Sequence, residues 1–161
     1  MIRARTVAAD RAPHITVTAW NRQRLEWLLK NHADAWSWRA AAFLERALAR
    51  AQVVEERAIP PGVATMRSRI AFRDERIGAR DVVTLAYPGE RALHEDGLSV
   101  LTPVGAALLG RSEGEAIRYT APDGSPKTIT LLEVLYQPEA GRRIVSRRVR
   151  TRPDSSMPAA L

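Results

Sequence analysis

The stretch IPPGVATMRSRIAF, residues 59–72, divides the chain into a helical part and a β-rich part. Neither Pro60 nor Pro61 can continue a helix, and Gly62 gives the backbone freedom to turn. Apolar residues recur with a helical period before this stretch and alternate within it. One face of the alternating segment holds Met66, Ser68, Ile70 and Phe72. The sequence therefore predicts an α+β chain whose main boundary lies near residue 59.

Two amphipathic helices are expected before that boundary. One stripe of the first helix holds Leu25, Leu28, Leu29 and His32. Thr18 is placed to cap this helix through its hydroxyl oxygen. The second helix should run from about Trp38 to Gln52, and the short connection predicts an antiparallel, coiled-coil-like hairpin over residues 14–58. A helix of about 14 residues is only about 21 Å long, so this arm is short.

About five strands and one short helix are expected beyond the boundary, in a second domain over residues 59–141. Strands are predicted at 63–72, 81–87, 98–101, 115–121 and 128–137, and one or two helical turns at 104–109. Gly110 is expected to stop this short helix, because glycine readily adopts the backbone conformation that ends helices.

The composition excludes several kinds of site. The chain of 161 residues has no cysteine, which removes disulfides, thiolate nucleophiles and thiolate metal ligands. No apolar run approaches the roughly 20 residues of a membrane helix, and no signal-peptide core follows the N-terminus, so a cytoplasmic protein is expected. The histidines, His14, His32 and His94, lack the spacing of metal ligands. We therefore expect no metal site and no cofactor.

Most of the net charge of +7 lies at the end of the chain. Residues 1–141 hold 19 Lys and Arg against 17 Asp and Glu, whereas residues 142–161 hold six arginines against Asp154 alone. The six are Arg142, Arg143, Arg147, Arg148, Arg150 and Arg152. Such a tail is either a solvated extension, partly disordered, or an electrostatic contact for nucleic acid, and both interpretations stay open.

Two short segments resemble functional motifs. Residues 105–112, GAALLGRS, imitate a phosphate-binding P-loop, but Ala-Ala-Leu-Leu favours a packed helix over an open cradle. In the connection between the two helices, Asp34 is the only acid, with Trp36 and Trp38 close to it. The two tryptophans either form a contact surface or fold back over the end of the hairpin.

The β-rich part contains the motifs of a known family. They are ATMRSRIAF at 64–72, VTLAYP at 83–88, LSVLTPVGAALLG at 98–110 and YQPEA at 136–140. With these motifs the chain resembles the Gre transcription-factor superfamily, and within it the Rnk branch, the regulators of nucleoside diphosphate kinase. The resemblance spans roughly residues 14–141 and is weak in the hairpin and strong beyond it.

The resemblance implies an FKBP-like C-terminal domain that binds bacterial RNA polymerase at the entrance of its secondary channel. The family's docking segment corresponds to Thr102, Pro103, Val104 and Gly105. Cleavage-stimulating Gre factors insert a longer coiled coil, whose tip carries an Asp and a Glu that help to hold a catalytic magnesium ion. Asp34 has no such acidic partner, and a single carboxylate is a poor ligand set for magnesium.

The function expected from these features is non-enzymatic regulation of transcription, by a monomer that docks on RNA polymerase and competes with cleavage factors. Two alternatives stay open. A cleavage-stimulating elongation factor would need an acidic pair at the hairpin tip. A nucleic-acid-binding module would act through the arginine-rich tail, about which the resemblance says nothing.

Overall fold

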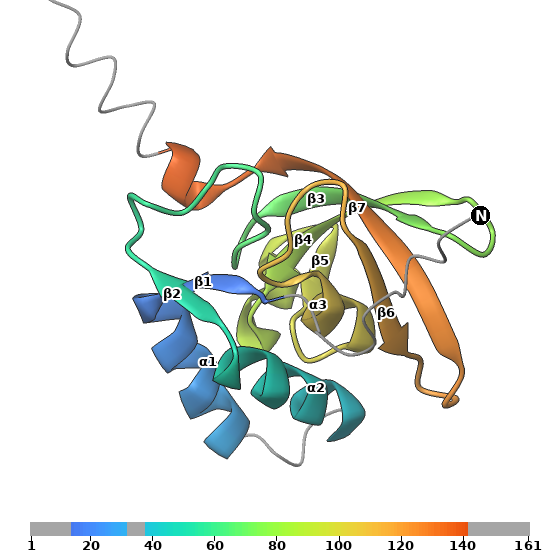
Figure 1. Cartoon of the computed structure of the whole chain (residues 1–161), viewed down its shortest axis with the longest axis horizontal. Helices are drawn as coiled ribbons and strands as arrows, with labels where there is room; N and C mark the ends of the chain where they lie inside the picture. The colour runs from blue at the N-terminus through green and yellow to red at the C-terminus, as the bar shows by residue number, and fades with distance from the viewer. Residues whose placement is uncertain (1–13, 32–37, 142–161) are drawn as a thin grey trace, which may run out of the picture.

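The computed structural model describes residues 14–31 and 38–141. The helical part consists of β1 (Thr16–Thr18), α1 (Ala19–Asn31), α2 (Trp38–Ala49) and β2 (Gln52–Val54). Figure 1 shows α1 and α2 side by side at one end of the molecule. The hydroxyl oxygen of Thr18 accepts a hydrogen bond from the backbone N–H of Asn21 at 3.2 Å. The predicted cap of the first helix is therefore confirmed.

The second helix is shorter than predicted. It ends at Ala49, and Gln52 begins a strand that pairs in parallel with β1, from Thr16 opposite Gln52 to Thr18 opposite Val54. The apolar spacing continues past Ala49, so spacing alone extends the helix too far. The backbone of residues 52–54 instead finds its hydrogen-bond partners in a strand from the start of the described chain.

The β-rich part forms a mixed five-stranded sheet. In spatial order its strands are β5 (Gly97–Ser99), β4 (Arg80–Ala86), β3 (Arg69–Asp74), β7 (Pro126–Tyr136) and β6 (Ala116–Thr120). Neighbouring strands are antiparallel except β4 and β5, which are parallel. The predicted α+β class, with helices before the sheet, is confirmed.

The strand predicted at 63–72 begins later than expected. Val63 forms an isolated bridge with Ser112, residues 66–67 form a turn, and β3 starts at Arg69. The four residues predicted on one face are nonetheless all buried: Met66, Ser68, Ile70 and Phe72. The backbone of Arg67 has φ +64°, a left-handed conformation that interrupts a strand. The alternation therefore predicted the buried face correctly, but it did not predict the burial of Ala71 on the other face or the late start of the strand.

Two short helices complete the fold. The predicted helical turns form α3 (Pro103–Leu108), which packs between α2 and β6. Gly110 ends this turn with φ +73°, and a Cβ built on it would lie 2.6 Å from Ile15 Cβ. Glycine is therefore required there both for conformation and for close approach. The 3-10 helix η1 (Pro88–Leu93) is not predicted by any sequence pattern used above.

One hydrophobic core joins the helical and β-rich parts. Its buried members include Leu25 of α1, Leu44 of α2, Leu85 of β4 and Leu131 of β7, each with almost no exposed surface. Burying a leucine side chain contributes about 1.5–3 kcal/mol to folding. The inner face of the hairpin is thus part of the main core, and its outer face stays available for contacts.

Candidate functional site

The predicted docking segment is a rigid turn between β5 and α3, and we call residues 99–105 the docking loop. Thr102 caps α3: its hydroxyl oxygen accepts a hydrogen bond from the N–H of Gly105 at 3.1 Å and donates one to the carbonyl of Ser99 at 2.7 Å. Pro103 follows in the first helical turn, where its fixed φ suits the helix. Thr102 and the two residues after it are half-buried, so each presents part of its surface to solvent.

Gly105 supports the docking loop from within. It is buried, and a Cβ built on it would lie 2.2 Å from the carbonyl oxygen of Ser99. No side chain fits at that distance, so the end of β5 and the start of α3 can meet only over a glycine. Gly105 therefore shapes the loop, and Thr102, Pro103 and Val104 offer the surface.

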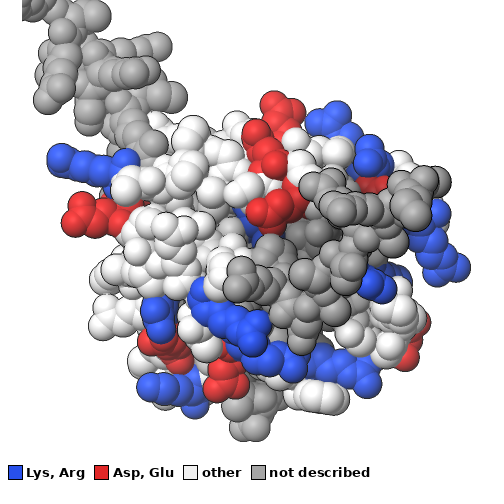
Figure 2. Space-filling model, viewed as in Figure 1, with Lys and Arg blue, Asp and Glu red and all other residues white. Residues whose placement is uncertain are grey.

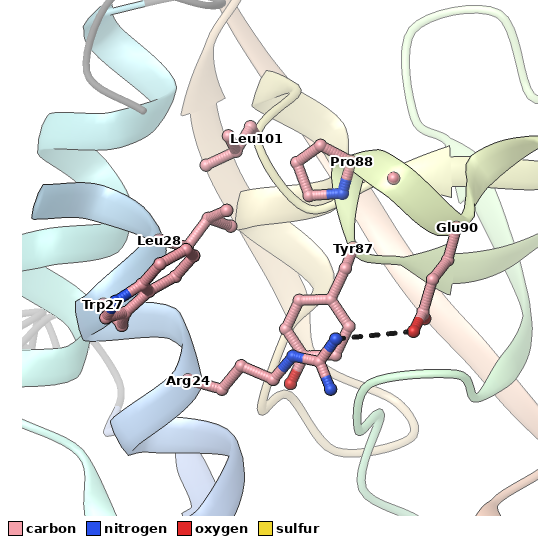
Figure 3. Close-up of a pocket in the computed structure, with 8 residues that line it drawn as sticks. Arg24, Trp27, Leu28, Tyr87, Pro88, Glu90 and Leu101 are labelled. Atoms are coloured by element: carbon pink, nitrogen blue, oxygen red, sulfur yellow. Dashed lines mark ion pairs between the residues drawn. The ribbon is translucent and has the colours of Figure 1, made fainter. Parts of the chain in front are cut away.

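A groove of about 250 Å³ opens between α1 and η1, beside the docking loop. We call it the α1–η1 groove. It is lined by Arg24, Trp27, Leu28, Tyr87, Pro88, Gly89, Glu90 and Leu101. Figure 3 shows Trp27 and Leu28 reaching it from α1, with Pro88 and Leu101 across from them. Because Leu101 directly precedes Thr102, the groove is continuous with the docking loop.

A charged cluster closes one end of the α1–η1 groove. The guanidinium carbons of Arg24 and Arg67 lie 4.3 Å and 5.8 Å from the ring centre of Tyr87. Glu90 accepts hydrogen bonds from Arg67 Nε at 3.0 Å and Nη2 at 2.6 Å, and its carboxylate lies 3.6 Å from Arg24. The Tyr87 hydroxyl donates to Asn21 Oδ1 at 3.1 Å. Two arginines therefore lie against one aromatic ring, and both form ion pairs with Glu90.

The protonation states of this cluster are well defined. Burial raises the pKa of Tyr87 to about 12, so its hydroxyl remains a donor. The hydrogen bonds from Arg67 lower the pKa of Glu90, which keeps that carboxylate charged. The same contact raises the pKa of Arg67. At neutral pH the cluster thus has one more positive than negative charge among Arg24, Arg67 and Glu90.

The left-handed backbone of Arg67 is held by its neighbours. A non-glycine residue in this conformation costs about 1–2 kcal/mol. The N–H of Arg67 donates to the carbonyl of Leu85 at 2.7 Å, while its side chain is fixed by the two bonds to Glu90. Strained residues that the surrounding structure holds in place cluster at functional sites. The conformation of Arg67 therefore supports this end of the groove as part of a functional site.

A second groove, of about 260 Å³, reaches the docking loop between α2 and β6. We call it the α2–β6 groove. It is lined by Trp38, Arg39, Ala40, Ala42, Phe43, Arg46, Pro103, Tyr119 and Thr120. Two residues predicted for different sites, Trp38 and Pro103, thus meet in one groove. Trp38 is 71% exposed and stacks with the Arg39 guanidinium at 5.2 Å, which favours a contact surface over a folded-back plug for this tryptophan.

Several predicted residues lie outside the part of the chain that the structure describes. They are Asp34 and Trp36 of the hairpin connection and Arg142, Arg143, Arg147, Arg148, Arg150 and Arg152 of the tail. Within the described ranges, basic and acidic side chains are mixed. On the face in Figure 2, basic side chains gather along the lower part, over the two helices, with acidic ones among them. This mixture matches the near-balance of charge in residues 1–141.

The remaining sequence motifs have simple structural outcomes. The P-loop-like stretch forms the buried helix α3 and the turn after it, so the interpretation as packed helix is confirmed. Within residues 14–31 and 38–141, no group of three His, Asp or Glu side chains is arranged so that it could hold a metal ion. None of the helices in these two ranges combines the length and apolar character of a membrane span.

Comparison with known proteins identifies the family. The family described as "Transcription elongation factor, GreA/GreB, C-term" matches residues 59–136. The chain is 39% identical over 128 residues to the "Regulator of nucleoside diphosphate kinase" of Escherichia coli strain K12, which covers 80% of this chain and 93% of that protein. The chain belongs to the Rnk family. The resemblance read from the sequence motifs is thereby confirmed.

Two proteins that carry the Gre name also match this chain. A solved structure, "Prokaryotic transcription elongation factor GreA/GreB from Nitrosomonas europaea", is 36% identical with a TM-score of 0.61 and covers 77% of this chain and 99% of that one. The GreA of Flavobacterium johnsoniae is 30% identical over 93 residues, 58% of each protein. The match thus covers nearly the whole length of the Rnk relative, whereas the match to this GreA covers little more than half of either protein.

In this Rnk family member the YQPEA motif, residues 136–140, forms hydrogen bonds to the start of the β-rich part, and we call these contacts of Gln137 and Glu139 the clasp. The side-chain amide of Gln137 donates to the carbonyl oxygens of Pro60 and Val63, each at 2.8 Å. Glu139 accepts a hydrogen bond from the Thr65 hydroxyl at 2.8 Å. Both Gln137 and Glu139 are buried. The motif therefore ties the end of β7 to the segment that follows the helical hairpin.

Loss of the clasp is expected to destabilise the protein. Gln137→Ala leaves the buried carbonyl of Val63 without its side-chain donor and should lower the free energy of unfolding by about 2 kcal/mol. Gln137→Glu sets carboxylate oxygens against two carbonyls and should cost at least as much. Urea denaturation measures both, with exposed Gln23→Ala on α1 as the control, which should change stability by less than about 0.5 kcal/mol. An unchanged midpoint for Gln137→Ala would contradict the clasp.

The sequence motifs did not single out the residues of the α1–η1 groove that come from α1. One signal was available. Trp20 and Trp27 are seven residues apart and so lie on one helical face, on the side away from the leucine stripe. They are 61% and 59% exposed. Two large aromatic side chains on the outer face of a short helix indicate a contact surface.

Proposed function

We propose that this chain is a non-enzymatic regulator of transcription that binds RNA polymerase near its secondary channel through the docking loop. The observation that supports this most directly is the docking loop itself. It is capped by Thr102, shaped by Gly105 and half-exposed at Pro103 and Val104, in a chain of the Rnk family whose β-rich part matches GreA/GreB. The proposal includes an FKBP-like topology for the five-stranded sheet.

The geometry of the loop suits a protein contact. Its hydrogen bonds and its proline are in place without a partner, so little conformational entropy is lost when a partner binds. The loop lies between an apolar groove on one helix of the hairpin and an aromatic, basic groove on the other. Such a surface combines rigid anchors with nearby apolar area, which is typical of protein interfaces.

The short hairpin decides which kind of polymerase factor we propose. Helices α1 and α2 have 13 and 12 residues, which gives an arm of about 20 Å. An arm of that length, with Asp34 as its only acid between the helices, is poorly equipped to bring a magnesium-binding pair into an active centre. We therefore place the protein as a competitor of Gre-type cleavage factors.

A proline substitution tests the docking loop. Pro103→Asn should weaken capture of core RNA polymerase by at least about fivefold, because it removes rigidity and contact area from the centre of the loop. The thermal midpoint should stay within a few degrees, since Pro103 is half-buried. Pro122→Asn, at an exposed turn, is the matched control. Equal capture of Pro103→Asn and wild type would remove the loop from the interface, and no capture of polymerase by wild type would refute the proposal.

A further inference from the structure

We propose that the α1–η1 groove is a second contact site for RNA polymerase. It binds a polymerase segment in which an apolar side chain lies next to a carboxylate. This inference rests on the proposed function and extends it, because the docking loop alone gives no role to the outer face of α1. The groove combines two properties that together define the ligand. One is its apolar wall, and the other is the guanidinium of Arg24.

The apolar wall comes from three separate parts of the chain. Trp27 and Leu28 line it from α1, Pro88 from η1, and Leu101 from the docking loop. In Figure 3 these side chains face the same space. Trp27 is 59% exposed, whereas Leu28 and Leu101 are buried and form the base. A partly exposed tryptophan over an aliphatic base is a typical anchor for an apolar side chain of a partner protein.

Arg24 supplies the charge. Its side chain is 42% exposed and its guanidinium is stacked on Tyr87 at 4.3 Å. Within the described residues it makes an ion pair with Glu90 at 3.6 Å but no hydrogen bond, whereas Arg67 donates two hydrogen bonds to the same carboxylate. The N–H donors of Arg24 are thus held in place and available. A guanidinium so oriented suits a carboxylate, which it can bind with two parallel hydrogen bonds.

The position of the groove argues for the same partner as the docking loop. Leu101 belongs to the wall of the groove and is followed at once by Thr102, the cap of the docking loop. A partner bound across Leu101 and Thr102 would therefore contact both the groove and the docking loop. Arg67, whose backbone is left-handed and whose side chain donates to Glu90, lies at the same end of the groove.

The test measures binding of labelled protein to core RNA polymerase by fluorescence anisotropy. Trp27→Ser and Arg24→Glu should each weaken binding by about tenfold, the effect of losing an anchor residue. Arg24→Lys keeps the charge but loses the paired donors and should fall between wild type and Arg24→Glu. The matched controls, Gln23→Ser and Lys30→Glu, alter exposed residues of the same helix that do not line the groove and should change binding less than about twofold.

Each outcome separates this inference from the proposed function. If wild type binds polymerase and both Trp27→Ser and Arg24→Glu bind equally well, the groove is not a contact and only this inference fails. If wild type does not bind, the proposed function fails first. If Trp27→Ser abolishes self-association in sedimentation without weakening polymerase binding, the occupant is a second copy of the chain and the inference is overturned. Thermal midpoints within a few degrees of wild type establish that the variants are folded.

Discussion

Added to a polymerase complex stalled by backtracking, this protein should leave the transcript uncut and should slow the cleavage stimulated by a Gre factor. The two helices form an arm of about 20 Å, and Asp34 is the only acid in the sequence between them, so we expect no delivery of magnesium. Under the proposed function its docking loop corresponds to that of the cleavage factors, so we expect both to occupy one place on polymerase. When the concentration of this protein is about ten times its Kd for polymerase and exceeds that of the Gre factor, cleavage should become roughly tenfold slower. RNA shortening on a gel measures the effect.

Two variants make this experiment decisive. Pro103→Asn should relieve the inhibition, because it weakens docking, while Pro122→Asn should inhibit like wild type. Cleavage by the protein alone that disappears in Asp34→Ala would favour the alternative of a cleavage-stimulating elongation factor. A protein that binds polymerase and still fails to slow cleavage at saturation would show that it docks elsewhere.

Gly105→Ala should lower the free energy of unfolding by about 3 kcal/mol, the second large effect expected. The added Cβ would lie 2.2 Å from the carbonyl oxygen of Ser99 and 3.0 Å from the hydroxyl oxygen of Thr102. That carbonyl is backbone and already accepts hydrogen bonds from the N–H and hydroxyl of Thr102, so it cannot move without breaking the cap of α3. The thermal midpoint should fall by roughly 10 °C, and polymerase capture should weaken in the fraction that stays folded.

Gly89→Ala is the matched control for this prediction. Gly89 also lies in a short helix near the grooves, but it is exposed and a Cβ built on it meets nothing within 4 Å. Its replacement should change stability by less than about 0.5 kcal/mol. If Gly105→Ala melts as Gly89→Ala does, the contact between β5 and α3 is loose, and the docking loop is not the preformed surface proposed above.

Local signals in the sequence determined the parts of the fold that depend on neighbouring residues. Pro60 and Pro61 lie in a segment without helix, between β2 and β3, as expected because no proline can continue a helix. Thr18 caps α1, and the segment before Gly110 forms α3, because capping hydroxyls and left-handed glycines act within a few residues. The docking loop was identified differently, through the resemblance of the motif at 98–110 to the Gre family, and its cap Thr102, its proline Pro103 and its glycine Gly105 lie within four positions of one another.

Tertiary structure alone decided the parts that depend on distant residues. The helix predicted to reach Gln52 ends at Ala49 because Gln52–Val54 pair with β1, and no spacing within the helix contains that partner. The α1–η1 groove joins Arg24 and Trp27 to Tyr87, Glu90 and Leu101. At one end of this groove Glu90 pairs with two arginines from distant parts of the chain, Arg24 and Arg67. Such contacts arise only when the core brings separate segments together, because apolar periodicity records which face is buried and not what it packs against.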